Sequence, residues 1–265
     1  MFEFYKLYLP ISKREIKIEI YIPSDYDENI LYDSLYLLDG QNAFLDSHAA
    51  FGRSIRAGSY IDFAKSEMNK NIIGIGIHNI GSDRGRVNEY SPFLIQNAKL
   101  DNWKNNDVSI CNSYCIDLIN TIIPFIENKY NINRNPNNRF IYGSSLAATT
   151  AIYLAFKYPN SFNYVGAFST ATFLFEDEFF KFLEKNKINN KNIFLYYGKN
   201  ETSDAYKKEV LYAEQGNKLY KFFKDNNIRT KLVISANGIH NEENWDMHFM
   251  DFINFIYNDD IEYKK

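Results

Sequence analysis

Residues 140–148 read Phe-Ile-Tyr-Gly-Ser-Ser-Leu-Ala-Ala, and no other stretch of the chain is as informative. Its apolar start is typical of a buried strand, and the residues after the serines continue as a helix. A serine at a sharp strand-to-helix turn is strained, so the residues two before and two after it must be small. Ser145 has Gly143 and Ala147 there, whereas Ser144 would have a bulky tyrosine. The spacing favours Ser145 as a nucleophile, although a serine that caps the helix fits the same residues.

Apolar strands and amphipathic helices alternate on both sides of this turn. The alternation predicts an α/β fold whose central sheet is mainly parallel and is flanked by helices on both faces. Segment 15–22 differs, because isoleucines alternate with polar residues there, which predicts an antiparallel strand near a sheet edge. The other expected strands are 35–38, 72–77, 140–142, 193–197 and 229–236, and the expected helices are 114–129, 207–226 and 242–257.

The composition indicates an ordinary globular protein. With 30 Lys and Arg against 33 Asp and Glu, the net charge is −3, which argues against a nucleic-acid partner. The uncharged run 140–156 is too short and polar for a bilayer span, and Glu3 stands where a secretory leader would be basic. Without repeats or linkers, residues 1–265 are expected to form a single domain, located in the cytoplasm and without a membrane partner. Cys111 and Cys115 are expected to be buried thiols.

A serine hydroxyl needs a general base, most often an imidazole, to act as a nucleophile. In folds with this strand–turn–helix element the chain order is serine, acid, histidine. Two of the four histidines, His240 and His248, follow Ser145. His240 comes just after the expected strand 229–236, whereas His248 lies within the helix that follows. Because chemistry in α/β sheets gathers beyond the carboxyl ends of the strands, we expect His240 to be the base.

The acid is expected after strand 193–197, where the sequence continues Gly-Lys-Asn-Glu-Thr-Ser-Asp. Glu201 is closer to the strand end, and Asp204 is the second candidate. Either carboxylate would fix the tautomer of His240 and stabilise its protonated form. Taken alone, the segment is also typical of a surface turn. It gains weight from its position between Ser145 and His240.

An acyl-transfer site also needs N–H groups that stabilise the oxyanion. The amide of Leu146, directly after the nucleophile, is the first candidate. The second is the amide of Gln41 in the loop after strand 35–38, where Gly40 permits a tight turn. An Asp-Gly pair is also typical of a β-hairpin, but no alternating strand follows it here.

Four motifs, taken in order, resemble those of one known family. They are Leu-Leu-Asp-Gly-Gln-Asn-Ala-Phe at 37–44, Arg-Val-Asn-Glu-Tyr-Ser-Pro at 86–92, Gly-Ser-Ser-Leu at 143–146 and Gly-Ile-His-Asn-Glu-x-x-Trp at 238–245. Over residues 16–256 the chain resembles the esterase family that includes esterase D, enterochelin esterases, feruloyl esterases and mycolyltransferases. The resemblance implies an α/β-hydrolase fold with a Ser–His–acid site and no cofactor, and it favours Glu201 over Asp204. Ala147 and Ala148 stand where glycine is commoner in the family.

The resemblance also draws attention to residues around the site. Arg86 and Glu89 match an Arg-x-x-Glu-Tyr segment of the family, and we expect a structural ion pair there that holds the loop near the site. Direct contact of Arg86 with substrate is the alternative. The polar segment 97–107 fits either a flap over the site or an exposed loop. The aromatic candidates for an acyl pocket are Phe44, Tyr90, Trp103 and Trp245.

These features predict a serine carboxylic-ester hydrolase that forms an acyl-enzyme on a small acyl or aryl ester. Ser145, His240 and Glu201 would form the triad, the substrate would be a small-molecule ester, and no metal or other cofactor is expected. Residues 240–243 lack the His-Glu-x-x-His spacing of a zinc site. The alternatives are an acyltransferase with the same triad and a non-catalytic binding module of the same fold. No motif specifies the acyl group, the alcohol or the oligomeric state.

Overall fold

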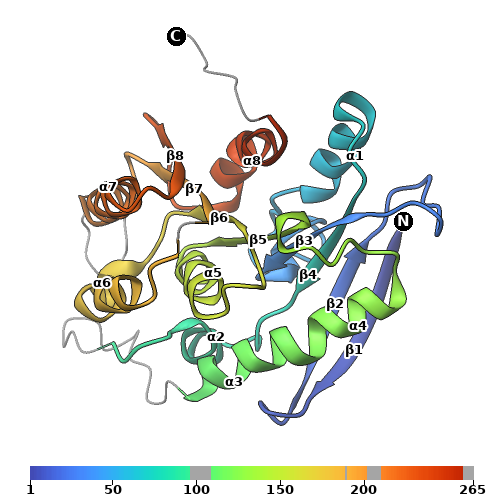
Figure 1. The fold of residues 1–265 in the computed structure, drawn as a ribbon, viewed down its shortest axis with the longest axis horizontal. Helices are drawn as coiled ribbons and strands as arrows, with labels where there is room; N and C mark the ends of the chain where they lie inside the picture. Colours follow the sequence, from blue (N-terminus) through green and yellow to red (C-terminus); the bar gives the residue numbers. More distant parts are fainter. Residues whose placement is uncertain (96–108, 189, 202–209, 259–265) are drawn as a thin grey trace.

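Within the residues that the structure describes, eight strands form one mixed sheet (Figure 1). The structure is a computed structural model, and it describes residues 1–95, 109–188, 190–201 and 210–258. The strand order is β1-β2-β4-β3-β5-β6-β7-β8, in which β3 to β8 run parallel and β2 is antiparallel to both neighbours. The strands are β1 (Phe2–Leu9), β2 (Arg14–Tyr21), β3 (Asp33–Leu38), β4 (Ile72–Ile77), β5 (Arg139–Ser144), β6 (Tyr164–Phe168), β7 (Asn192–Gly198) and β8 (Arg229–Ser235).

The predicted α/β fold with a mainly parallel central sheet is confirmed. Segment 15–22 corresponds to the antiparallel strand β2, one position from the sheet edge, in agreement with its alternation. Two strands escape the sequence prediction. β1 forms the edge itself and has aromatic residues at both odd and even positions, which hides its period of two. β6 has only five residues, and the glycine and alanine within it weaken the strand signal.

Helices cover both faces of the sheet, as predicted (Figure 1). On one face α1 (Ala57–Met68) and α8 (Glu242–Tyr257) contribute Ile61, Phe249 and Phe252 to a core that they share with the central strands. The other face carries α2 (Asp83–Tyr90), α3 (Ser109–Asp117), α4 (Ile123–Lys129), α5 (Leu146–Lys157), α6 (Glu176–Lys185) and α7 (Val210–Asp225). Short 3₁₀ turns occupy η1 (Gly40–Asn42), η4 (Pro136–Asn138) and η5 (Thr172–Leu174).

Helix α3, the π-helical turn η3 (Leu118–Ile122) and α4 form one continuous helical run from Ser109 to Lys129. Pro124 lacks a backbone N–H, and the hydrogen-bond ladder changes from α to π just before it. By length and mean hydropathy, 1.3, this run is the one helix of the described residues that could cross a membrane. Its side chains Cys111, Leu118 and Ile126 are fully buried in the core, so packing against the sheet explains its apolar character.

Candidate active site

Ser145 lies at the sharp turn between β5, which ends at Ser144, and α5, which begins at Leu146. Its φ of 58° and ψ of −126° are values that residues other than glycine rarely adopt. The turn is tight, because a Cβ atom on Gly143 would lie 2.5 Å from the carbonyl of Ala147. Glycine is therefore required two residues before the serine, and alanine is accommodated two residues after it. The strand–turn–helix element expected around Ser145 is present.

The structure brings together the serine, histidine and glutamate that the sequence nominated. Ser145 Oγ lies 3.0 Å from His240 Nε2, and His240 Nδ1 lies 3.4 Å from Glu201 Oε2. Glu201 follows β7 and is fully buried, while His240 comes from the loop between β8 and α8. When serine, histidine and glutamate are arranged in this order, the imidazole can take the serine proton while the carboxylate orients the ring. His248 lies instead on α8 and contacts Asp251, and Asp204 lies outside the described residues.

A buried hydrogen-bond chain holds the carboxylate of Glu201. Its Oε1 accepts from the backbone N–H of Gly198 at 2.7 Å and from Ser169 Oγ at 2.6 Å. Ser169 Oγ in turn accepts from Trp245 Nε1 at 2.9 Å. Ser169 is fully buried and has a φ of 53°, a backbone strain of the kind that clusters at functional sites. Sequence reasoning missed Ser169, because it follows β6, a strand that the sequence did not reveal.

The two expected oxyanion donors lie at the ends of neighbouring strands. Gln41 is in η1 just after β3, and Leu146 is the first residue of α5 after β5, which pairs with β3. Among the described residues, neither backbone N–H has a protein acceptor. The loop crosses the end of β4 so closely that a Cβ on Gly40 would lie 2.2 Å from the backbone of Gly76. Glycine is thus a steric requirement just before Gln41, and both amides are available to a ligand.

A salt bridge fixes the start of this loop. The guanidinium of Arg86 donates to both carboxylate oxygens of Asp39, from Nη2 at 2.7 Å and from Nε at 2.9 Å. Burial alone would lower the pKa of Arg86, but the Asp39 carboxylate outweighs it and raises that pKa. The hydroxyl of Tyr90 accepts from the backbone N–H of Asp39 at 3.0 Å. Arg86 and Tyr90 therefore support the residue that precedes Gly40.

The ion pair expected at the Arg-x-x-Glu segment takes a different form. Arg86 pairs with Asp39, whereas Glu89 pairs with Arg14 of β2 and accepts from the backbone N–H of Ile80 at 3.0 Å. Arg86 and Glu89 lie three residues apart on α2, but the partner of Arg86 follows β3 and the partner of Glu89 begins β2. The expected holding role is present, but in two ion pairs instead of one.

The aromatic pocket candidates occupy packed positions. Phe44 packs on β4, where Cβ atoms on Gly74 and Gly76 would meet its ring, and Tyr90 is fully buried. Trp245 is 4% exposed and stands edge-on to His240, with ring centroids 5.0 Å apart. Trp103 and segment 97–107 lie outside the described residues. A role of these residues in an acyl pocket stays a prediction.

A second aromatic ring contacts the histidine and was not nominated. Tyr212, on the first turn of α7, is 3% exposed, and its ring centroid lies 4.5 Å from that of His240 at an interplanar angle of 35°. No motif marks it among the 21 tyrosines of the chain. Only its contact with His240 in the folded chain identifies Tyr212.

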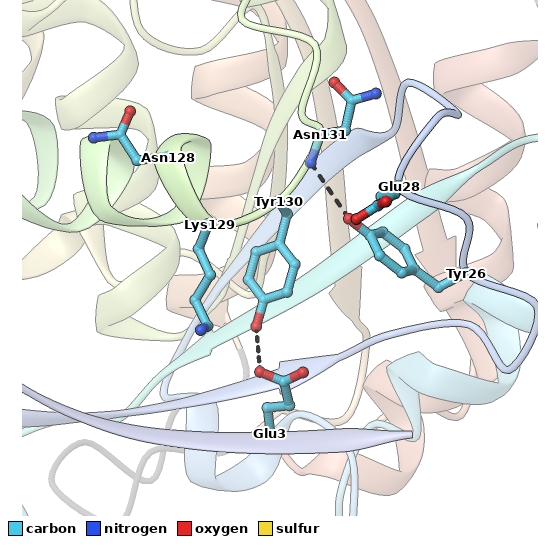
Figure 2. A pocket seen from close by; sticks show the side chains of 7 residues that line it. All are labelled: Glu3, Tyr26, Glu28, Asn128, Lys129, Tyr130 and Asn131. Atoms are coloured by element: carbon cyan, nitrogen blue, oxygen red, sulfur yellow. Dashed lines mark hydrogen bonds between the residues drawn. The ribbon is translucent and has the colours of Figure 1, made fainter.

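A cavity of about 530 Å³ lies away from this site (Figure 2). Its wall includes Tyr130 and Asn131, which adjoin the bridge between Tyr32 and Ile132 ahead of β3 and β5. That end of the parallel strands is opposite the one where Ser145 lies. The hydroxyl of Tyr130 donates to Glu3 Oε2 at 2.9 Å across the cavity. In the described part of the chain, no three His, Cys, Asp or Glu side chains are grouped to hold a metal ion.

Comparison with known proteins places this chain in a family. The model of the family described as "Putative esterase" matches residues 10–256. The chain belongs to this esterase family. This chain is also 24% identical over 158 residues to Uncharacterized protein YbbA of Bacillus subtilis (strain 168). That match covers 58% of this chain and 56% of the relative, so the chain matches only about half the length of that protein.

Solved structures with the α/β-hydrolase fold match this chain over almost its full length. The BES protein from Bacillus cereus superposes with a TM-score of 0.75 and 18% identity, over 96% of this chain and 94% of that one. An IroE-like serine hydrolase from Shewanella oneidensis superposes with a TM-score of 0.80 and 15% identity, over 98% of this chain and 81% of that one. A ferulic acid esterase from Anaeromyces mucronatus superposes with a TM-score of 0.65 and 18% identity, over 96% of this chain and 89% of that one. The predicted α/β-hydrolase fold and family are confirmed.

Proposed function

We propose that this esterase is a serine carboxylic-ester hydrolase with a Ser145–His240–Glu201 triad. The observation that carries the proposal is the 3.0 Å distance from Ser145 Oγ to His240 Nε2, at a turn that holds the serine at a φ of 58°. A neutral imidazole at that distance accepts the hydroxyl proton as the oxygen attacks an ester carbonyl. Glu201 faces the other ring nitrogen, so it fixes the imidazole tautomer and stabilises the imidazolium.

The reaction proceeds in two halves. Ser145 Oγ bonds to the carbonyl carbon, and the resulting oxyanion accepts hydrogen bonds from the N–H groups of Gln41 and Leu146. The imidazolium of His240 then protonates the alkoxide leaving group as the ester C–O bond breaks, which leaves an acyl-enzyme. Water, deprotonated by His240, attacks the acyl carbon in the same geometry. The bond between the acyl carbon and Ser145 Oγ then breaks, and His240 returns its proton to Oγ, which releases the acid and restores the Ser145 hydroxyl.

The substrate in this proposal is a small-molecule ester with a small acyl or aryl group. Access to the nucleophile is narrow, because Ser145 is only 6% exposed. The net charge of −3 offers no general attraction for nucleic acid. Side chains of the apolar helical run 109–129 belong to the core, which supports the proposal of a protein without a membrane partner. Two free, buried cysteines fit a reducing compartment, which supports the cytoplasm as the place of action.

Hydrolysis of p-nitrophenyl esters that range from acetate to octanoate, together with aryl esters such as methyl ferulate, tests this function. Ser145→Ala is expected to lower kcat/KM by at least about 1,000-fold, because the nucleophile is lost while substrate binding remains. Ser144→Ala is the matched control on the neighbouring residue and is expected to keep the activity. Equal hydrolysis by wild type and Ser145→Ala would contradict the proposal. Products analysed with added alcohols distinguish water from another acyl acceptor.

A further inference from the structure

We infer that Tyr212 is a positioning residue for His240, a role that rests on the proposed triad. Its ring holds the imidazole in the orientation that spans Ser145 and Glu201. The same ring stabilises the positive charge that the imidazole gains when it takes the serine proton.

Two aromatic side chains bound the imidazole of His240. The ring of Tyr212 lies against it at 4.5 Å between centroids and 35° between planes, and Trp245 meets it edge-on at 5.0 Å and 85°. Tyr212 is itself fixed, because it is 3% exposed and packs edge-to-face on Phe173 of η5 at 5.1 Å. An imidazole enclosed in this way has few alternative orientations, and the 3.0 Å approach of Nε2 to Ser145 Oγ depends on its orientation.

The ring of Tyr212 also acts on charge. An aromatic face is negative relative to its edge, so it attracts a cation that lies over it, and more strongly where water is excluded. In the proposed mechanism the imidazole of His240 gains its positive charge when it takes the proton of Ser145. The contact therefore stabilises the transition state more than the ground state, which is the condition for raising kcat.

Tyr212 stays neutral while it does this. Burial and the nearby charge of Glu201 both raise the pKa of its phenol. The phenol therefore remains protonated at the pH values at which an esterase works, and the ring makes no charge-based ion pair with the imidazolium. Two parts of this side chain therefore lie next to the triad: the aromatic face against His240, and the phenol hydroxyl, which interacts with the side chain of Ser145.

A second tyrosine–histidine pair provides an internal comparison. The ring of Tyr196 lies 4.7 Å from that of His248 at 31°, almost the same geometry, on a histidine that contacts Asp251 and not Ser145. Stacking alone is therefore a packing feature of this fold. What distinguishes Tyr212 is that its partner exchanges a proton with the nucleophile, so the decisive readout is catalytic.

The test compares four variants of the full chain once wild type is active and Ser145→Ala is inactive. Tyr212→Phe keeps the ring, Tyr212→Leu removes it, and pentafluorophenylalanine at position 212 keeps its volume but reverses the sign of its face. Tyr220→Leu, further along α7, is the matched control. Steady-state kinetics and the rate of fluorophosphonate labelling are measured, with thermal unfolding as the check on folding.

We expect Tyr220→Leu to stay within about twofold of wild type. Tyr212→Phe keeps the ring but loses the hydroxyl that interacts with the Ser145 side chain, so it is the reference for the other two variants at position 212. Tyr212→Leu and the pentafluoro variant are expected to lose about 2- to 30-fold in kcat, the range of a cation–π contact, with little change in KM and a parallel loss of labelling rate. If Tyr212→Leu does not fold, the pentafluoro variant decides. A pentafluoro variant as active as Tyr212→Phe would overturn the inference and leave the triad untouched.

Discussion

Substitution of Ser169 tests the hydrogen-bond chain behind the site. Ser169→Ala removes the hydroxyl that donates to Glu201 Oε1 at 2.6 Å and accepts from Trp245 Nε1 at 2.9 Å. Glu201 keeps the backbone N–H of Gly198 at 2.7 Å, so the carboxylate stays in place with one donor fewer. The fold is expected to survive, and His240, whose ring faces Glu201, is expected to lose part of its orientation.

The magnitude follows from the two lost contacts. A hydrogen bond to a charged group contributes about 1.5–3 kcal/mol, and a buried donor without an acceptor costs about 1–3 kcal/mol. Because neighbouring losses are not additive, Ser169→Ala is expected to lower the free energy of unfolding by about 2–4 kcal/mol. Because His240 is less well oriented, the activation free energy is expected to rise by about 1 kcal/mol, which corresponds to about a fivefold loss of kcat.

Ser169→Gly is the matched variant, because it removes the same hydroxyl but tolerates the φ of 53°. It is expected to lose the same activity as Ser169→Ala and to be about 1 kcal/mol more stable. Urea denaturation and steady-state ester hydrolysis measure the two quantities. Wild-type kcat and wild-type stability in Ser169→Ala would refute the reasoning about this chain.

Two further predictions concern charges. Arg86→Met leaves the carboxylate of Asp39 without its cation, so it is expected to cost about 2–4 kcal/mol of unfolding free energy. It is also expected to lower kcat, because Asp39 begins the loop that carries Gln41. Arg84→Met on the same helix is the control, and equal urea midpoints for the two variants would contradict the prediction. Burial lowers the pKa of Lys191 to about 8. Between that pH and about 10.4 the unfolded chain binds the proton that the folded chain has lost, so unfolding free energy is expected to rise with pH there in wild type and not in Lys191→Met. Identical pH profiles in urea would rule this out.

The candidate site was predictable where local rules govern it. Ser145 stands out because a small residue on each side is a steric demand of one tight turn, which five consecutive residues record. His240 and Glu201 stand out because both follow apolar strands and because the chain order restricts the choice. Parallel strands place those ends together whatever the lengths of the helices between them.

The residues that escaped prediction depend on tertiary contact. Ser169 follows a five-residue strand, and Tyr212 lies on a helix face that only the folded chain brings to His240. The partner of Arg86 is Asp39, 47 residues away in the chain, and not Glu89, which belongs to the same motif as Arg86. Phe44 lies close to Gln41 in the chain, but its side chain packs on the glycines of β4. The spacing of residues in the sequence does not show which partner each of these side chains contacts in the folded chain.

The central claim is that Ser145 is a nucleophile activated by His240. Fluorophosphonate labelling followed by intact-mass measurement and peptide mapping tests it most directly. The account predicts one adduct per chain, located on Ser145, and a labelling rate that falls at least about 100-fold in His240→Ala. An adduct on another residue, or ester hydrolysis by wild type with no adduct on Ser145, would contradict it.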